Sequence, residues 1–198
     1  MSNNYTYIDF DCSYIDPANG ILKNLQNITN ADVLQFVESG VVTKRLQEIY
    51  ENPIKIQGVE SLFAIHKYLF QDIYSWAGKQ RVVEISKDGK QFFPTIFFEN
   101  AFKYINHLIN EFRKIPKNNK KGLAEKLAEI LDNINYLHPF REGNGRVQRE
   151  FLRLLALEKE LTLHLNPPDN KSIYDRYMKG TIESDVNLLA DLIFELIL

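Results

Sequence analysis

Cysteine is nearly absent from this 198-residue chain, which has only Cys12. One cysteine cannot form an intramolecular disulfide, and no cluster of cysteines and histidines has the spacing of a zinc site. An excess of either charge is also missing, because 24 basic residues oppose 26 acidic ones. This balance leaves no electrostatic footprint for nucleic acid. We therefore expect a reducing compartment and no DNA or RNA partner.

Long apolar runs are missing as well. The apolar stretches are a few residues long, whereas a membrane-spanning helix needs about 20 apolar residues. The first residues, MSNNYTYIDFDCSYID, lack the basic start and apolar core of a signal peptide. We predict a cytoplasmic protein that does not bind membranes, of the bacterial type. Export as an effector through another kind of signal stays open.

The composition is that of an ordinary globular domain, with 44% hydrophobic and 25% charged residues. We expect residues 1–54 to form an N-terminal arm and short helices that pack on a main domain at 55–198. The first 28 residues favour irregular structure with one short extended piece. Thr29 is a candidate cap for a helix at 30–38, Gly40 is expected to break it, and a second short helix is expected at 43–51.

Apolar residues then recur at the three-and-four spacing of amphipathic helices. The predicted helices cover about residues 59–76, 98–115, 123–138, 144–160, 170–180 and 185–197, the last capped by Ser184. Between the first two of these helices, β-forming residues flank an Asp-Gly turn, which predicts a hairpin over 81–94. The fold class is therefore mainly α, a helical bundle with one β-hairpin.

The densest chemistry lies at the junction of two predicted helices, in the segment HPFREGNGRVQR at 138–149. Pro139 should end the first helix at His138. Gly143, Asn144 and Gly145 open the second helix. Glycines there allow successive N–H groups to turn toward one point, where the helix dipole also favours negative charge. The segment therefore predicts an anion cradle.

Charged residues surround this predicted cradle. Arg146 and Arg149 lie three apart on one helical face, and their guanidinium groups suit a di- or triphosphate. Glu142 is placed to hold a Mg²⁺ ion that bridges phosphates. His138 in its neutral form can take a proton from an attacking hydroxyl, and Phe140 is expected to anchor the loop in the core.

These residues resemble the signature of the Fic (Fido) family, H-x-F-x-[D/E]-G-N-G-R-x-x-R. The segment 138–149 matches it without departure. The residues LFQDIYSWAG at 69–78 and Arg81 also resemble the family segment before its hairpin, and in all about residues 55–195 fit. The resemblance implies a Fic-type helical bundle whose hairpin is a flap.

The implied activity is Mg²⁺-dependent transfer of AMP from ATP to a Ser, Thr or Tyr hydroxyl of a target protein, with release of pyrophosphate. In this scheme His138 is the general base and Glu142 is the metal ligand. Asn144 and the cradle contact the α-phosphate, while Arg146 and Arg149 hold the β- and γ-phosphates.

The resemblance also implies that the flap docks the target as an added strand. Ser86 and Lys87 would approach the nucleotide, and Tyr174 or Tyr177 would line the adenine side. The expected docking residues of the flap are Ile85, Ser86, Lys87, Asp88 and Gly89.

Members of this family often carry an inhibitory helix, [S/T]-x-x-x-E-[G/N], whose glutamate pairs with the second arginine of the signature. Neither the first 50 residues nor the last helix has this pattern. Thr95 to Asn100 matches it but follows the flap, where helix initiation by Thr95 is the expected role. We therefore predict a separate, small antitoxin-like inhibitor, as in toxin–antitoxin pairs.

Three other hypotheses fit the residues less well. The same fold could transfer phosphate, UMP or a phosphodiester alcohol, although the intact cradle argues against a kinase-like branch. A nucleotide-binding or interaction module without catalysis would not need a base at His138. An all-helical structural domain would make the loop incidental.

Overall fold

The computed structural model describes residues 5–8, 13–87, 89–167 and 169–198. Within them the fold is mainly α-helical with a small sheet, as predicted. The helices are α1 (Ala31–Glu51), α2 (Ser61–Phe70), α3 (Phe98–Lys114), α4 (Lys120–Leu137), α5 (Asn144–Leu157), α6 (Lys171–Glu183) and α7 (Val186–Leu196). The strands are β1 (Tyr5–Ile8), β2 (Glu84–Lys87) and β3 (Lys90–Gln91), and a 3₁₀ turn, η1, covers Thr95–Phe97.

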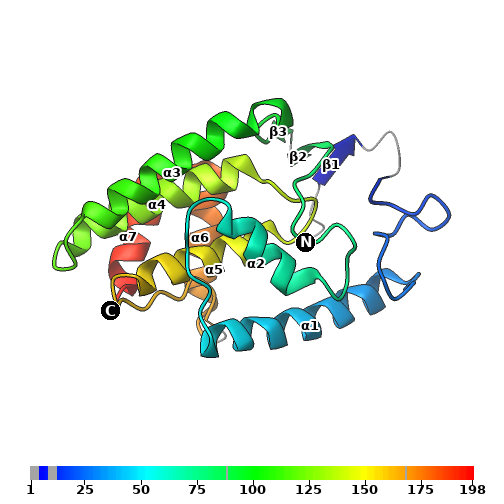
Figure 1. Cartoon of the computed structure of the whole chain (residues 1–198), viewed down its shortest axis with the longest axis horizontal. Coiled ribbons are helices and arrows are strands. Elements are labelled where there is room, and N and C mark those ends of the chain that lie inside the picture. Colours follow the sequence, from blue (N-terminus) through cyan, green and yellow to red (C-terminus); the bar gives the residue numbers. More distant parts are fainter. Residues whose placement is uncertain (1–4, 9–12, 88, 168) are drawn as a thin grey trace.

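Helix α4 forms the centre of the bundle and packs against α3, α5, α6 and α7. Figure 1 shows α3 and α4 side by side along the length of the molecule. The apolar residues that predict α4 are its buried face, including Leu123, Leu127 and Ile134, because their spacing places them on one side of the helix. The C-terminal end of α4 carries His138 to the end of the bundle where the sheet lies.

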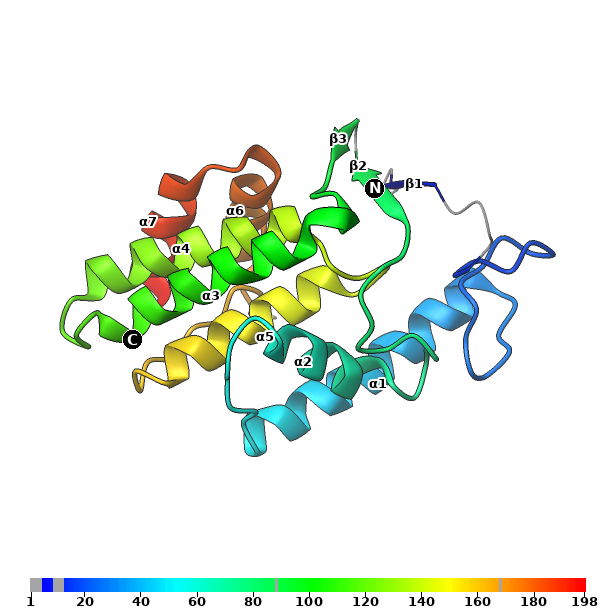
Figure 2. The same ribbon diagram turned by 45° about the horizontal axis from the view of Figure 1, so that its top comes forward.

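A second group of helices supports the other side of this junction. Helix α2 contacts both α1 and α5, so it joins the N-terminal helix to the helix that follows the signature loop. Figure 2 shows α1 and α2 on the side of α5 that lies away from α6 and α7. Helix α5 is thus packed against α2 and α4, which both come before it in the sequence.

The predicted hairpin is present, and it has a third strand. Strand β2 pairs antiparallel with β3, with Ser86 opposite Gln91, and Gly89 in the turn has φ +79°. Such a positive φ favours glycine. Strand β1 pairs antiparallel with the other edge of β2, which gives the order β1-β2-β3. The extended piece expected within the first 28 residues is therefore part of the flap sheet.

The N-terminal helix differs from the prediction. One 21-residue helix, α1, replaces the two short helices, and Gly40 lies inside it. A single helix glycine costs only about 1 kcal/mol, and burial of Leu34, Val42 and Ile49 on one side of α1 offsets this cost. The cap is Asn30, whose side chain accepts from the Val33 N–H, and not Thr29.

Other predicted boundaries also shift. Helix α2 ends at Phe70, before the predicted end near Trp76, and Ile73 and Tyr74 are buried in turns that follow it. Helix α7 is capped by Asp185, which accepts from Leu188 N–H, whereas Ser184 ends α6 in a left-handed conformation. Thr95 lies in η1 and donates its hydroxyl to Glu84 in the flap.

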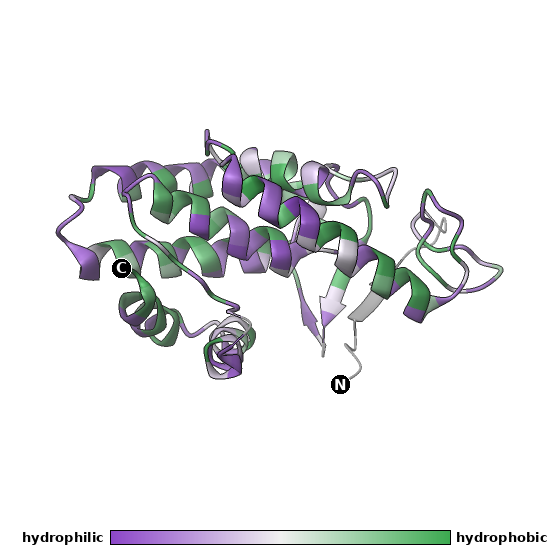
Figure 3. Cartoon of the chain, turned by 90° about the horizontal axis from the view of Figure 1, so that it is seen from below, coloured by the Kyte–Doolittle hydropathy of each residue, from purple (hydrophilic) through white to green (hydrophobic). Residues whose placement is uncertain are grey.

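The surface carries a few apolar residues outside the core. Figure 3 shows polar and apolar residues alternating around the helices, and apolar residues reach the outer side of α1 near its N-terminus. Phe36 is 81% exposed there. Among the helices of the described ranges, none combines the length and the apolar character that crossing a bilayer requires.

Candidate nucleotide and phosphotransfer site

The backbone turns sharply at the end of α4. His138 is the C-cap residue of this helix and has φ 45° and ψ 61°. The following Pro139 disfavours right-handed helical geometry at His138, and this left-handed conformation stops the helix where it was predicted to stop. A non-glycine residue in this region costs about 1 kcal/mol or more. The strained conformation therefore lies at His138, the residue with the most reactive side chain of the loop.

The His138 ring is buried and held from two sides. Its Nδ1 lies 3.3 Å from the Asn135 carbonyl oxygen, and the Phe92 ring of the flap stacks on it at 3.8 Å between centroids. Because a carbonyl oxygen only accepts, Nδ1 carries the proton and Nε2 keeps the lone pair. Burial lowers the pKa of His138 to about 3. The ring is therefore neutral at pH 7, in the tautomer that a general base at Nε2 needs.

The loop after His138 closes on itself through Asn144. The Asn144 side chain accepts from the Phe140 N–H at 3.0 Å and donates to the Phe140 carbonyl at 2.8 Å. Phe140 itself is buried and stacks on His66 with 3.9 Å between ring centroids. The side chain of Asn144 thus closes the loop through both its oxygen and its nitrogen.

His66 on α2 contacts the same loop at the Glu142 carbonyl. Gly78 N–H donates to its Nδ1 at 2.8 Å, so its Nε2 carries the proton and donates to the Glu142 carbonyl at 3.1 Å. Burial lowers the pKa of His66 to about 3, which keeps this ring neutral as well. His66 lies within the helix predicted at 59–76, and the structure shows it positioning the loop at Glu142.

The predicted anion cradle has the required backbone. Gly143 has φ +84°, and a Cβ at this position would lie 2.4 Å from the Phe70 ring. No other residue fits there without strain. Within the described residues, the N–H groups of Asn144 and Gly145 make no hydrogen bond. They are unpaired donors of the first turn of α5, at the positive end of its dipole.

Arg146 is clamped at the edge of this cradle. Its Nη1 lies 2.5 Å from the Glu38 carboxylate of α1, its Nη2 lies 3.4 Å from Glu142, and its guanidinium lies over the Phe70 ring. Tyr74 donates its hydroxyl to the same Glu38 carboxylate. Glu38, which lies outside the inhibitory pattern, is therefore the acid that the N-terminal region supplies, and it contacts the first signature arginine.

Arg149 has an aromatic environment instead. Its guanidinium lies 5.5 and 5.4 Å from the ring centroids of Tyr174 and Tyr177 on α6. The buried Tyr177 hydroxyl donates to Gln148, so this ring is fixed in place. Both tyrosines line the cavity, and they also position an arginine. Their contact with a nucleotide stays a prediction.

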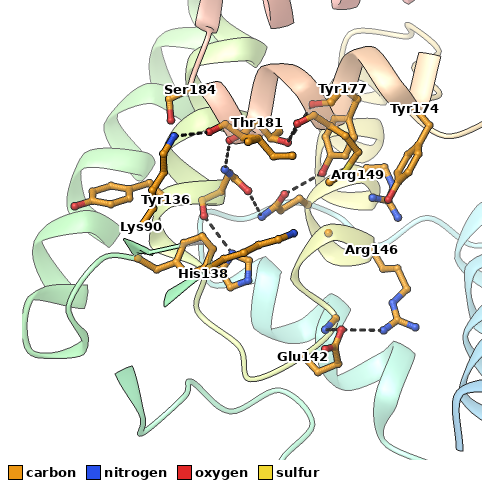
Figure 4. Close-up of a pocket in the computed structure, with 18 of the residues that line it drawn as sticks. Lys90, Tyr136, His138, Glu142, Arg146, Arg149, Tyr174, Tyr177, Thr181 and Ser184 are labelled. Carbon is orange, nitrogen blue, oxygen red and sulfur yellow. Dashed lines mark hydrogen bonds and ion pairs between the residues drawn. The ribbon is translucent and has the colours of Figure 1, made fainter. Parts of the chain in front are cut away.

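One cavity of about 410 Å³ is lined by His138, Glu142, Gly143, Gly145, Arg146, Arg149, Tyr174 and Tyr177. Asn144, which was predicted to contact the α-phosphate, is not among its lining residues. Figure 4 shows His138 and Glu142 among the lining residues, with Arg146 and Arg149 on α5. The size fits a nucleotide ligand. Besides the loop and the two arginines, the lining comprises Lys87, Lys90, Gln91, Phe92, Asn135, Tyr136, Gln148, Tyr174, Tyr177, Met178, Thr181, Ile182 and Ser184.

The flap borders the cavity with the end of β2 and with β3. Lys87 lines it, whereas Ser86, one residue earlier, is not among the lining residues. Ile85 is buried, and Gly89 lies in the turn. Asp88, which was also predicted for the flap, lies outside the described residues. Lys90 donates to the Ile182 carbonyl of α6, so the flap tip reaches across the opening.

Arg81 joins the flap to the signature loop. Its buried guanidinium donates to the carbonyls of His138, Val83 and Phe93 at 2.9, 2.7 and 2.5 Å. Its backbone N–H donates to the Pro139 carbonyl at 2.8 Å. One side chain thus fixes the catalytic loop and both ends of the hairpin at the same point.

Glu142 meets the main condition for a Mg²⁺ ligand. Its carboxylate lies in the cavity, where it accepts from the Gly143 N–H at 2.9 Å and approaches Arg146. The described residues contain no group of three or more metal-ligating side chains. A single carboxylate suits a Mg²⁺ ion that takes its other ligands from substrate phosphates and water.

Sequence reasoning did not assign site roles to four residues that act here: Glu38, His66, Arg81 and Phe92. Each reaches the loop or Arg146 from a distant part of the chain. A charged or imidazole side chain on an otherwise apolar helix face, as at His66, is the signal that could have marked such a residue.

Comparison with known proteins agrees with this site. The Fic/DOC family model matches residues 56–156. The chain is 31% identical over 144 residues to the Escherichia coli "Probable protein adenylyltransferase Fic", covering 73% of this chain and 72% of that protein. It is therefore a member of the Fic/DOC family.

A second relative is longer. The chain is 34% identical over 146 residues to the protein adenylyltransferase VbhT of Bartonella schoenbuchensis. The match covers 73% of this chain but 30% of VbhT. The match thus spans less than a third of that relative's length.

Solved structures share the fold at low sequence identity. The BepC protein of Bartonella tribocorum, crystallised with AMPPNP, superposes with a TM-score of 0.82 at 19% identity, covering 96% of this chain and 99% of that one. The N-terminal Fic domain of a Bartonella quintana effector with bound ADP gives 0.81 at 20% identity, covering 93% and 94%.

Proposed function

We propose that this protein is a protein adenylyltransferase, which transfers AMP from ATP to a Ser, Thr or Tyr hydroxyl of a target protein and releases pyrophosphate. The observation that carries the proposal is the pairing of a base with an anion site. His138 is neutral with its lone pair on Nε2, and it lines the same cavity as the N–H cradle at the start of α5.

A residue of the cavity can be assigned to each step of the proposed reaction. The cradle at Gly143–Gly145 binds the α-phosphate, and Nε2 of His138 takes the proton as the target oxygen bonds to the α-phosphorus. The bond between the α-phosphorus and pyrophosphate then breaks. Arg146 and Arg149 hold the departing phosphates because their charge cannot be lost.

Glu142 would hold Mg²⁺, which supplies positive charge to the phosphates when bound. The names of the adenylyltransferase relatives support the reaction, and the AMPPNP and ADP in the two Bartonella structures support a nucleotide in this cavity. Of the two flap residues predicted to approach the nucleotide, Ser86 and Lys87, Lys87 is the one that lines the cavity and would contact the nucleotide. The target would join the flap sheet as an extended strand.

A small antitoxin-like inhibitor also belongs to the proposal. In the described part of the chain Arg149 contacts two tyrosine rings and forms no ion pair, whereas Arg146 has two carboxylates. A partner that supplies a glutamate to Arg149 would block the triphosphate. The cytoplasmic location stays a prediction.

The test is incubation with Mg²⁺ and host-cell lysate, using ATP labelled at the α- or at the γ-phosphate. We expect protein-bound label from the α-phosphate only, and its loss in His138→Ala. His107→Ala, which removes an exposed histidine of α3, is the matched control and should keep full labelling. Label from the γ-phosphate would indicate phosphate transfer, and unchanged labelling in His138→Ala would remove the assigned base.

A further inference from the structure

The backbone carbonyl of Asn135 lacks a helical donor because of the proline that follows the base. In a continuing α-helix this carbonyl would accept from the N–H four residues later, at position 139. Pro139 has no N–H. The N–H of His138 donates to the Ile134 carbonyl, one residue earlier, so the Asn135 carbonyl is left to accept from the His138 ring at 3.3 Å. The end of α4 thus builds the contact that sets the tautomer of the base.

The side chain of Asn135 is held by two helices that pack against α4. Its Nδ2 donates to the Thr181 carbonyl of α6 at 2.9 Å, and its Oδ1 lies 3.5 Å from Nε2 of Gln148 on α5. Gln148 is itself buried. The residue whose backbone contacts the base is therefore attached through its side chain to both α5 and α6.

The Thr181 carbonyl fixes the direction of these hydrogen bonds. Because a carbonyl only accepts, Asn135 presents its NH₂ group to Thr181 and its oxygen to Gln148. Gln148 then presents its NH₂ group to Asn135 and its oxygen to the Tyr177 hydroxyl, which donates at 3.1 Å. The Thr181 hydroxyl donates to the Tyr177 carbonyl at 3.1 Å and closes the cycle. We call these four residues the amide network.

The amide network lies between the base and the phosphate side of the cavity. At one end Asn135 contacts His138, and at the other the Tyr177 ring lies 5.4 Å from the Arg149 guanidinium. Figure 4 shows Tyr177 and Thr181 of this network on α6, with dashed lines that lead toward His138. The network therefore joins three helices at the point where the site depends on their relative position.

From this geometry we propose that Asn135 and Gln148 are positioning residues, which hold the Asn135 carbonyl on Nδ1 of His138 and so keep the lone pair on Nε2. The effect on rate rests on the proposed function. Without the network, the last turn of α4 loses its attachment to α5 and α6, and the contact with Nδ1 lengthens. The neutral ring can then carry its proton on Nε2, where it cannot act as a base.

The first experiment measures transfer of α-label to lysate protein by the full chain with Mg²⁺. Asn135→Leu keeps the backbone carbonyl and removes both side-chain bonds. We expect the maximal rate at saturating ATP to fall about tenfold or more, while the half-saturating ATP concentration changes less than about twofold. Asn133→Leu is the matched control, because Asn133 lies on the same helix and its side chain donates to the Glu129 carbonyl. It should keep the rate.

Gln148→Leu breaks the amide network from α5. It removes the donor to Asn135 and the acceptor of the Tyr177 hydroxyl, and we expect a similar loss of rate. The double variant with Asn135→Leu should lose no more than about threefold beyond the single variant, because both act through one contact. Losses that multiply would overturn the shared role.

Nitrogen NMR of the histidine rings separates this inference from the proposed function, because it requires no transfer. The signals of His138 are identified by their loss in His138→Ala. We expect the proton on Nδ1 in the wild-type chain, and a shift toward Nε2 in Asn135→Leu and Gln148→Leu. If both leucine variants unfold, Tyr177→Phe, which removes one hydroxyl, must give a smaller shift in the same direction.

The outcomes are distinct. An unchanged tautomer in the variants, with or without a lower rate, would overturn the positioning role, and so would a raised half-saturating ATP concentration at an unchanged maximal rate. If the tautomer shifts while no chain labels any protein, the amide network still sets the tautomer and the adenylyltransferase assignment fails.

Discussion

The signature loop and the flap border the same cavity, yet they are held in different ways. In the loop, Phe140 is bonded at both its N–H and its carbonyl, Gly143 is fixed by its φ angle, and His66 holds Glu142. The flap is fixed at its base by Arg81, and at its tip the exposed Lys90 donates to the Ile182 carbonyl of α6. Under the proposed function, the loop would hold the phosphate and the base in fixed geometry, and the flap would be the part that admits ligands.

The largest expected effect comes from breaking the loop with Gly143→Ala. The new Cβ would meet the Phe70 ring at 2.4 Å in a backbone that disfavours any side chain. We expect a stability loss of about 2–3 kcal/mol and at least a hundredfold loss of labelling activity, measured by thermal unfolding and α-label transfer. Gly20→Ala has a similar φ and open space, so it should cost about 1 kcal/mol and leave activity intact. Full activity in Gly143→Ala would show that the cradle does not depend on this backbone.

Arg81→Lys should break the connection between the two regions. A lysine cannot reach the carbonyls of His138 and Phe93 together, so at least one of them loses a buried charged donor. We expect activity to fall about tenfold or more and stability to fall by about 2–4 kcal/mol. Arg113→Lys is the matched control, because Arg113 also binds backbone carbonyls and a carboxylate but lies away from the site. Equal activity losses in the two variants would deny Arg81 a role in the site.

The pH dependence tests what the flap contributes to the loop. Because burial lowers the pKa of His138 to about 3, kcat/KM should change little between pH 7.5 and 5.5. A base with the ordinary pKa of about 6.5 would lose about tenfold at pH 5.5. Phe92→Ala removes the stacked ring and should move the acidic limb toward 6.5. A wild-type limb already at 6.5 would contradict the burial argument.

The same shifts predict the direction of acid unfolding. His66 and His138 both have folded-state pKa values lowered to about 3 by burial. Between about pH 6.5 and 3 the unfolded chain therefore binds more protons than the folded one. Stability is fully present above this window and falls as the pH drops through it, which urea titrations at several pH values would measure.

A smaller effect is expected at the contact of Glu38 with Arg146. Glu38→Gln keeps the shape but removes the charge that holds this guanidinium. If Glu38 positions Arg146, KM for ATP should rise about threefold to tenfold with little change in kcat, in steady-state kinetics. Glu48→Gln, which removes a carboxylate paired with Arg45 on the same helix, is the control. A clear rise in activity in Glu38→Gln would instead make this acid an inhibitor.

Local patterns in the sequence predicted the helices and strands better than they predicted the long-range contacts that hold the site residues in place. Helix spacing, the Asp-Gly turn and the stop at Pro139 act between neighbouring residues, so α3, α4, the hairpin and the end at His138 were correctly placed. Gly40 was misread because a local breaker was outweighed by burial of the α1 face. The contacts of Glu38, His66 and Arg81 join segments tens of residues apart, and no periodicity encodes them. Strand pairing of β1 depends in the same way on a distant partner.

The left-handed backbone at His138 has a consequence for how this chain can change over generations. Glycine or asparagine adopts such a conformation more readily than histidine does, and φ is 45° at this position. Replacing the base by either residue would therefore relieve backbone strain. Foldability alone favours the loss of this histidine, and only selection for the chemistry itself can keep it in place.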